Sequence, residues 1–190
     1  ALMQGLADGY FILPVTIGDY LSKKFAEPKT DINRPEFVEA EKAVQKRIDN
    51  LFAVKGTVPV DVLHKELGHI MWEYVGMARD AEGLKKAIKE IDELKERFYK
   101  TVRVPGTQFE FNQELEKALR LEDFFEIGKL MARDAYERNE SCGGHFRIES
   151  QTEEGEAKRD DKNFMHVAAW EYKGEGVEPE LHKEPLNYEF

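Results

Sequence analysis

In the stretch Asn139–Arg147, NESCGGHFR, the helical periodicity of the sequence ends. Before it, apolar residues recur every three or four positions, and after it residues 148–158 form an acidic, polar run. The aromatic run Phe164–Tyr172 then predicts a β-strand, and Leu181–Phe190 is a candidate for a second one. Residues 174–176, GEG, can reverse the chain between them. The border therefore separates a helical region from a small β-hairpin.

Four amphipathic helices are predicted before this border, because each carries one apolar stripe at helical spacing. Pro35 and Pro59 open the first two helices, and Asp80 and Asn112 are placed to cap the other two. Short connections favour antiparallel neighbours. We predict a mainly α fold, an up-and-down helical bundle with a small C-terminal β-hairpin (α+β) appendage. The predicted inward stripes are Phe37, Ala40, Val44, Ile48 and Leu51; Leu63, Leu67, Ile70, Tyr74 and Ala78; Leu84, Ile88, Ile91, Leu94 and Phe98; and Leu115, Leu119, Phe124, Ile127, Met131 and Ala135.

Residues 1–26 are the most apolar part of the chain, and they predict a helix that is apolar around most of its circumference. Pro14 should end or kink this helix. The helical pattern is already present at Ala1 with no capping residue before it, so we expect the chain to be a piece of a longer protein. Three regions are predicted: a terminal helix at 1–26, a helical bundle domain at 34–138, and a loop and β-hairpin domain at 139–190.

Composition excludes several classes of function. The 190 residues carry a formal net charge of -10, which disfavours binding to nucleic acid or to anionic lipid surfaces. No apolar run is long enough to span a bilayer, so direct membrane insertion is not predicted. Cys142 is the single cysteine, which rules out an intrachain disulfide and fits a reducing compartment.

Two candidate sites have simple structural interpretations. His64 and His69 are five residues apart, whereas zinc-binding helical histidines are four apart, so no metal site is predicted. Gly143-Gly144-His145 predicts a turn with a positive φ angle and a histidine held by local hydrogen bonds. Cys142 is interpreted as a small residue in that turn; a nucleophile would need His145 as its base.

The charged residues after the turn are predicted to be structural. Arg147, Arg159, Asp160 and Asp161 are expected to form an ion-pair network that pins the loop to the bundle. General acid or base work would need a group with a shifted pKa in a cleft, and nothing in the sequence indicates one. No catalytic residue is predicted from the residues alone.

Several segments, in this order, resemble the C-terminal part of the flavoprotein subunit of succinate dehydrogenase and fumarate reductase. The resemblance extends over essentially the whole chain. Cys142 and Gly144 depart from it, because the family commonly has Arg and Ala there. The segments are ALMQGLADG at 1–9, MWEYVGMAR at 71–79, GL at 83–84, LKERF at 94–98, ESCGGH at 140–145 and RDDKN at 159–163.

The resemblance implies an enzyme that interconverts succinate and fumarate by hydride transfer to FAD and passes electrons to an iron–sulfur subunit. Through that subunit it would reach a membrane anchor, as a peripheral protein on the cytoplasmic side of the inner membrane. The family's catalytic residues precede Ala1, so none is placed on this sequence. Residues 1–26 would be the terminal helix of a missing FAD-binding domain.

One cofactor contact is implied by the resemblance. Ala1 and Leu2 match a Ser-Leu pair whose backbone N–H groups face the flavin, at the start of the family's helix. The chain alone is expected to hold no FAD, to be an inactive scaffold, and to self-associate through its uncovered apolar residues. Two alternatives stay open: the C-terminal region of an L-aspartate oxidase-like flavoenzyme, and a stand-alone helical protein-interaction module. The RDDxN motif and the closing hairpin favour the dehydrogenase/reductase branch.

Overall fold

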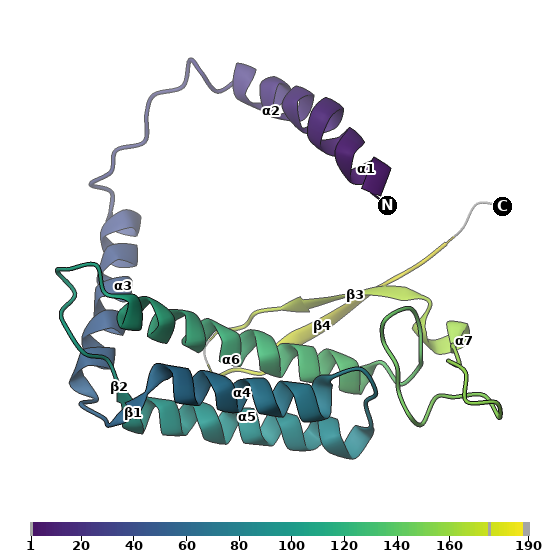
Figure 1. Cartoon of the computed structure of the whole chain (residues 1–190). Helices are drawn as coiled ribbons and strands as arrows, with labels where there is room; N and C mark the ends of the chain where they lie inside the picture. Colours follow the sequence, from purple (N-terminus) through teal and green to yellow (C-terminus); the bar gives the residue numbers. More distant parts are fainter. Residues whose placement is uncertain (1, 175, 188–190) are drawn as a thin grey trace. The chain divides into compact units, whose positions relative to one another are not determined.

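The computed structural model describes residues 2–174 and 176–187. The chain divides into two compact units, Ala1–Gln45 and Lys46–Phe190. Most of the described residues in regular structure are helical, and the C-terminal part ends in a β-hairpin (Figure 1). The mainly α fold with a small C-terminal hairpin is therefore confirmed.

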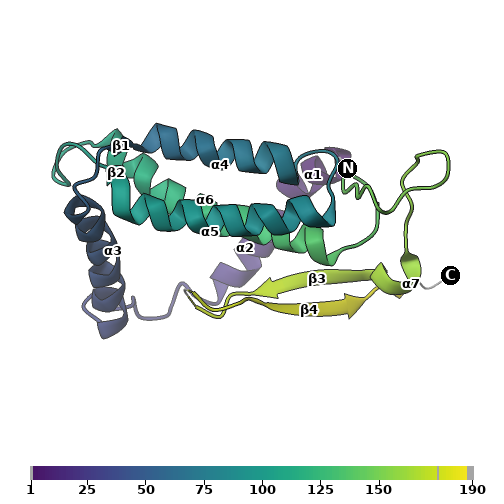
Figure 2. The ribbon, with the colours of Figure 1, turned by 90° about the horizontal axis from the view of Figure 1, so that it is seen from below.

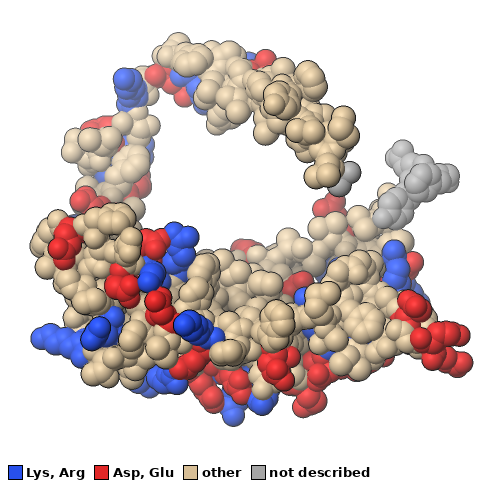
Figure 3. All heavy atoms as spheres, in the orientation of Figure 1, with Lys and Arg blue, Asp and Glu red and all other residues tan. Residues whose placement is uncertain are grey.

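The first unit begins with three consecutive helical pieces, α1 (Leu2–Ala7), the π-helical η1 (Asp8–Ile12) and α2 (Leu13–Ser22). Pro14 lies in the first turn of α2, and because proline has no N–H, the regular hydrogen-bond ladder is interrupted there. The helix does not end at Pro14: it continues to Ser22, and only the helix type changes before the proline. None of the described residues in these three pieces is buried, and uncharged surface covers most of the segment in Figure 3.

In the second unit, the helices α4 (Val60–Val75), α5 (Ala81–Thr101) and α6 (Gln113–Glu137) pack side by side (Figure 2). The two predicted caps are confirmed. Asp80 accepts a hydrogen bond from the backbone N–H of Gly83 at 2.8 Å, and Asn112 accepts one from that of Leu115 at 3.0 Å. Each bond satisfies an N–H group that has no partner inside its helix.

Helix α3 (Pro35–Ala53) joins this core only through its last turns. Its predicted stripe was partly wrong, because Phe37 and Val44 are exposed whereas Ile48 and Leu51 pack into the core. The bundle thus consists of three long helices and the end of a fourth.

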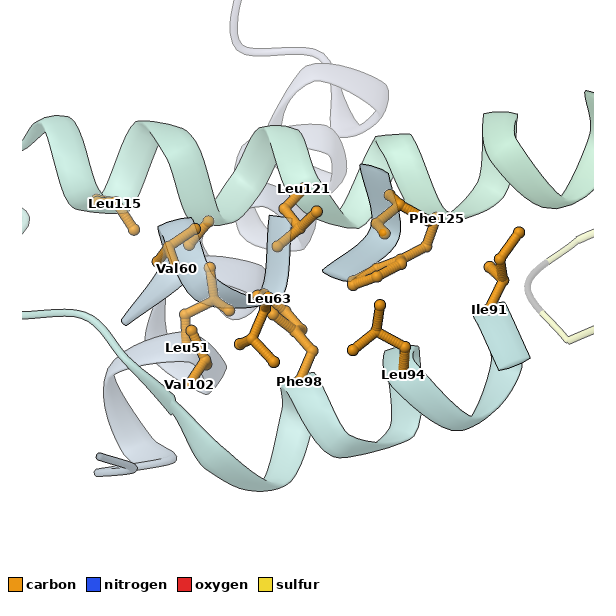
Figure 4. Close-up of a cluster of buried hydrophobic side chains, with 12 residues drawn as sticks. Leu51, Val60, Leu63, Ile91, Leu94, Phe98, Val102, Leu115, Leu121 and Phe125 are labelled. Carbon is orange, nitrogen blue, oxygen red and sulfur yellow. The ribbon is translucent and has the colours of Figure 1, made fainter. Parts of the chain in front are cut away.

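The main core lies between the four elements, where Phe98 of α5 meets Phe125 of α6 edge to face at 5.5 Å between ring centroids (Figure 4). A second, smaller cluster lies nearer the ends of α4 and α6, where alanines allow close packing. The main core consists of Leu51, Val60, Leu63, Leu67, Ile91, Leu94, Phe98, Val102, Leu115, Ala118, Leu121 and Phe125.

The predicted stripe of α6 was wrong over its middle. Ile127 and Met131 are 54% and 51% exposed, whereas the small residues Gly128 and Ala132 are buried. Counting large apolar residues misplaces the stripe here, because the helices approach closely where the side chains are small. A Cβ atom on Gly128 would lie 3.2 Å from the Met71 sulfur.

Two short strands were not predicted, since two-residue strands carry no periodicity. β1 (Val58–Pro59) and β2 (Val102–Arg103) pair in parallel beside the core. Gly56 permits the crossing, because a Cβ atom there would lie 2.0 Å from the carbonyl oxygen of Thr101. The segment after α5 therefore begins with a short strand.

The C-terminal hairpin pairs β3 (His166–Glu171) with β4 (Glu180–Pro185) in antiparallel fashion, after the single turn of α7 (Asp161–Phe164). Exposure alternates along β3, and Trp170 is one of its less exposed residues. The Trp170 indole N–H donates to the Asp134 carboxylate at 2.8 Å, which ties the hairpin to α6. Pro185 pairs at the open end of the hairpin, consistent with a proline on an edge strand.

Candidate functional site: an arginine–histidine junction

The loop that follows α6 folds back onto the connection between α4 and α5. The Arg79 N–H donates to the Phe146 carbonyl at 3.1 Å, and the Ile148 N–H donates to the Arg79 carbonyl at 2.8 Å. These bonds bring Arg79 close to Arg138, His145 and Arg147, which are near one another in sequence but far from Arg79. We call Arg79, Arg138, His145 and Arg147 the arginine–histidine junction.

The junction is built on a tight turn over Cys142–His145. The backbone groups of Cys142 and His145 exchange two hydrogen bonds, at 2.9 Å and 3.1 Å. Gly143 has a φ angle of 58°, which side-chain-bearing residues rarely adopt, so the predicted positive φ is confirmed. Cys142 is half-buried with a free thiol. The turn projects His145 towards the ends of the helices.

Arg147 is the most deeply buried basic residue among those described, with 2% of its surface exposed. Its Nη1 atom donates to the carbonyl oxygens of Ala135 and Tyr136 at 2.9 Å and 3.0 Å. These carbonyls lie in the last turn of α6, where no further helical N–H satisfies them. A cation at this end of a helix also interacts favourably with the helix dipole. Arg147 therefore caps α6.

Arg79 performs the same role for α4. Its Nε atom donates to the carbonyl oxygens of Val75 and Gly76 at 3.2 Å and 3.0 Å, and its Nη1 atom donates to His145 Nδ1 at 2.8 Å. Burial lowers the pKa of the Arg79 guanidinium, and the nearby Asp134 carboxylate opposes that effect. One imidazole thus receives a hydrogen bond from a helix-capping arginine.

His145 is held through both ring nitrogens. Because a guanidinium only donates, Nδ1 must accept from Arg79, and the proton lies on Nε2, which donates to the Arg138 carbonyl at 2.7 Å. Burial lowers the pKa of His145, and the charges of Arg79 and Arg147 lower it further; the Arg138 carbonyl and Asp134 act in the opposite direction. The imidazole is therefore neutral. Of its two hydrogen bonds only the one to the Arg138 carbonyl is local in sequence, so the predicted local bonding is confirmed only in part.

Two carboxylates balance the arginines. Buried Glu140 accepts from Arg138 Nη1 at 2.7 Å and from the Asp160 N–H at 2.9 Å. Glu149 accepts from the Ala81 N–H, at the start of α5, at 2.6 Å, and pairs with Arg147. Burial raises the pKa of Glu149, but the hydrogen bonds from Arg147 and Ala81 outweigh it, and the net shift is downward.

The predicted joint ion-pair network was wrong. Arg159 pairs with Asp161, two residues away, and both side chains are exposed. Asp160 instead caps the short helix α7, where it accepts from the Asn163 N–H. Neither aspartate pairs with Arg147, because buried Arg147 is already engaged by α6 carbonyls and Glu149. These residues are close in sequence, which suggested that they would pair. In the structure Arg147 is buried, whereas Arg159 and Asp161 are exposed.

The side chains of the junction connect helix ends and a loop, and all of them are engaged in hydrogen bonds or ion pairs. It joins the ends of α4 and α6, the start of α5, and the loop that leads to the hairpin. Within residues 2–174 and 176–187, no buried side-chain nitrogen or oxygen lacks a hydrogen-bond partner. Each junction member has local partners, so the arrangement is suited to holding the helix ends in place.

The described residues include one group that could hold a metal ion, formed by Glu171, Glu180 and His182 on the exposed hairpin. The Lys173 ammonium lies 2.9 Å from the Glu171 carboxylate and 2.7 Å from that of Glu180, so a cationic side chain already neutralises these two groups. His64 is outside the group, and its ring lies 5.4 Å from that of Phe124.

The predicted cofactor contact at Ala1 and Leu2 is only partly within the described chain. Ala1 lies outside the described residues. Leu2 is the first residue of α1, and 88% of its surface is exposed. The sequence contains no glycine-rich dinucleotide fingerprint.

The sequence is similar to those of known proteins. Residues 64–190 match the family described as fumarate reductase flavoprotein C-term. The chain is 35% identical over 135 residues to the fumarate reductase flavoprotein subunit of Escherichia coli, a stretch that covers 70% of this chain and 22% of that protein. It is 34% identical over 126 residues to an uncharacterized FAD-dependent oxidoreductase of Methanocaldococcus jannaschii, covering 66% of this chain and 22% of that protein.

Structural comparison agrees. The E. coli quinol fumarate reductase flavoprotein superposes with a TM-score of 0.68 at 28% identity, covering 86% of this chain and 26% of that one. The chain thus spans about a quarter of the length of the relatives it matches. No helix among the described residues is both long enough and apolar enough to cross a membrane. Because the family model matches more than half of the sequence, the chain belongs to the fumarate reductase flavoprotein C-terminal family.

Proposed function

We propose that this chain is the C-terminal scaffold of a flavoprotein subunit that interconverts succinate and fumarate. In the whole protein, FAD would supply the hydride chemistry, and electrons would pass to an iron–sulfur subunit and through it to a membrane anchor. The observation that carries the proposal is the family match over residues 64–190. The whole protein would be peripheral, on the cytoplasmic side of the inner membrane.

Each of the three predicted regions would have its own structural role in the whole protein. Residues 1–26 would form the terminal helix of the FAD-binding domain, with the backbone of Ala1 and Leu2 at the flavin edge. Residues 34–138 would provide the bundle, and residues 139–190 the loop and hairpin. The arginine–histidine junction supports this scaffold role, because it fastens helix ends with groups that are already satisfied.

The isolated chain is proposed to be inactive. Its site-forming residues comprise helix caps and ion pairs, and the family resemblance places the substrate-binding residues before Ala1. The test measures fumarate reduction with a reduced viologen dye, for this chain with added FAD and for the full-length protein at equal concentration. Turnover is expected only for the full-length protein; turnover by the isolated chain above the dye background would refute the scaffold role.

The iron–sulfur partner is tested separately. The full-length protein, expressed with the neighbouring subunits of its complex, is expected to co-purify with an iron–sulfur protein whose visible absorption accompanies the flavin. An active full-length flavoprotein that purifies alone and carries no iron–sulfur protein would contradict that partner and would favour the L-aspartate oxidase-like alternative.

A further inference from the structure

A groove lies between α6 and the hairpin, away from the arginine–histidine junction. It has a volume of about 240 Å³. For scale, an apolar cavity of about 150 Å³ holds one benzene molecule. The groove is therefore large enough for a molecule of about two fused rings. Its apolar lining consists of Ile127, Leu130, Trp170, Tyr172, Val177 and Pro179.

The walls differ in chemistry. Ile127 and Leu130 of α6 provide an aliphatic wall, and Trp170 and Tyr172 at the end of β3 provide aromatic rings. Tyr172 and Val177 are largely exposed, as is Ile127, so apolar surface stands uncovered at the groove. Aromatic rings beside aliphatic side chains favour a flat, apolar ligand, because dispersion contacts are greatest when a planar molecule lies between such walls.

The charges at the rim are neutralised in pairs. Lys129 binds Asp92 at 2.8 Å, Lys95 pairs with Glu126, and Arg133 pairs with Glu178. The Arg133 hydrogen bond lowers the pKa of Glu178, which keeps that pair ionised. Among the lining residues that the structure describes, each charged side chain has a partner of opposite charge, so a charged ligand would lose hydration without gaining a free counter-charge from them.

The two walls are tied together, so the groove does not depend on a bound partner. The Trp170 indole N–H donates to Asp134 of α6 at 2.8 Å, and the Arg133–Glu178 pair connects α6 to the segment before β4. We propose that this groove, which we call the hairpin slot, binds uncharged planar aromatic molecules of about two rings. The proposal does not depend on the proposed function.

The test uses the whole chain and the probe 2-naphthol, which is neutral and planar at pH 7. The chain has two tryptophans, so its NMR spectrum should contain two indole N–H signals, assigned with Trp72→Phe. The Trp170 signal is expected to shift saturably, with a dissociation constant of roughly 0.1–1 mM for a ligand of this size. The Trp72 signal, from an exposed residue on α4, serves as the internal control.

Charge and shape are then tested with two further probes. The anion 2-naphthoate is expected to bind at least about tenfold more weakly, because each cationic side chain among the described lining residues is already paired. Cyclohexanol, which is neutral but not planar, is also expected to bind more weakly. A Trp170 signal that does not move at millimolar 2-naphthol, or that responds equally to all three probes, would overturn the proposal.

Matched substitutions locate the site. Ile127→Glu places an unpaired carboxylate in the slot, and the dissociation constant should rise at least about tenfold. Met131→Glu, at an equally exposed position of α6 outside the lining, should change it by less than about twofold. If circular dichroism shows that Ile127→Glu unfolds, Val177→Glu makes the same test from the opposite wall. Unchanged binding in a folded slot variant would refute the assignment.

Discussion

The segment Leu2–Ser22 and helix α5 are equally long, yet they differ in how many side chains they bury. α5 is rich in Lys and Glu, and it buries Leu84, Ala87, Ile91, Leu94 and Phe98 along one stripe. The more apolar segment Leu2–Ser22 buries none of its described residues. The difference teaches that burial depends on a narrow stripe meeting a partner surface and not on the total apolar content.

The largest test of this comparison substitutes a phenylalanine in each region. Phe98→Ala in α5 should lower the free energy of unfolding by about 3–5 kcal/mol, because it leaves a cavity beside Phe125. Phe11→Ala in η1 should change it by less than about 0.5 kcal/mol. Urea denaturation followed by circular dichroism measures both. A comparable loss from Phe11→Ala would mean that the first segment is packed in solution.

The next effect compares a buried arginine with an exposed one. Arg147→Met removes the cap of α6 and leaves buried carbonyl groups without donors, so the free energy of unfolding should fall by about 2–4 kcal/mol. Arg159→Met removes an exposed ion pair and should leave the free energy of unfolding nearly unchanged. Equal losses in urea denaturation would remove the distinction between the junction and the surface pair.

A smaller effect concerns pH. The pKa of His145 is lowered in the folded protein from its ordinary value of 6.5, so near and below that pH the unfolded chain binds more protons than the folded one. Stability should therefore decrease as pH falls below 6.5, by at most about 1.4 kcal/mol per pH unit from this one group.

Replacing the histidine isolates its contribution to that dependence. His145→Gln should flatten the decrease in stability between about pH 6.5 and pH 5.5, since the titrating imidazole is gone. His69→Gln, at an exposed position of α4, is the matched control substitution. Thermal unfolding across this pH range provides the measurement. An unchanged slope for His145→Gln would show that other groups cause the acid sensitivity.

The smallest expected effect concerns self-association of the first segment. Leu6 and Phe11 are exposed apolar residues, and uncovered apolar surface promotes association. The double substitution Leu6→Ser and Phe11→Ser should reduce the weight-average mass measured by light scattering at high concentration. Phe109→Ser, which removes an exposed phenylalanine from the second unit, should have little effect. Monomeric wild-type chain at every concentration would contradict the expectation.

Local signals predicted much of the fold. The caps at Asp80 and Asn112 were found from residue type alone, because a side chain that accepts from the first free N–H groups is a short-range interaction. The stripe of α5 was also predictable, since large side chains recur there at helical spacing. The turn at Gly143 followed from the conformational freedom of glycine.

Long-range partners were not predictable in the same way. Arg79 and His145 form a hydrogen bond across 66 positions of sequence, and no local pattern connects them. The same applies to Gly128, whose burial reflects a close approach between helices, and to the hairpin slot, whose walls come from separate elements. Arg159 and Asp161 were predicted to share one network with buried Arg147, which was wrong, because their exposure depends on how the loop folds.

The sequence alone determined the helix boundaries near Asp80 and Asn112, the order helix-then-hairpin, the resemblance to the flavoprotein family, and the absence of a glycine-rich dinucleotide fingerprint. Tertiary structure decided which arginine is buried, which tautomer His145 adopts, and which face of α6 enters the core. The physical reason is range: capping and periodicity act within a few residues, whereas desolvation and pairing depend on surfaces that meet only after the chain has folded.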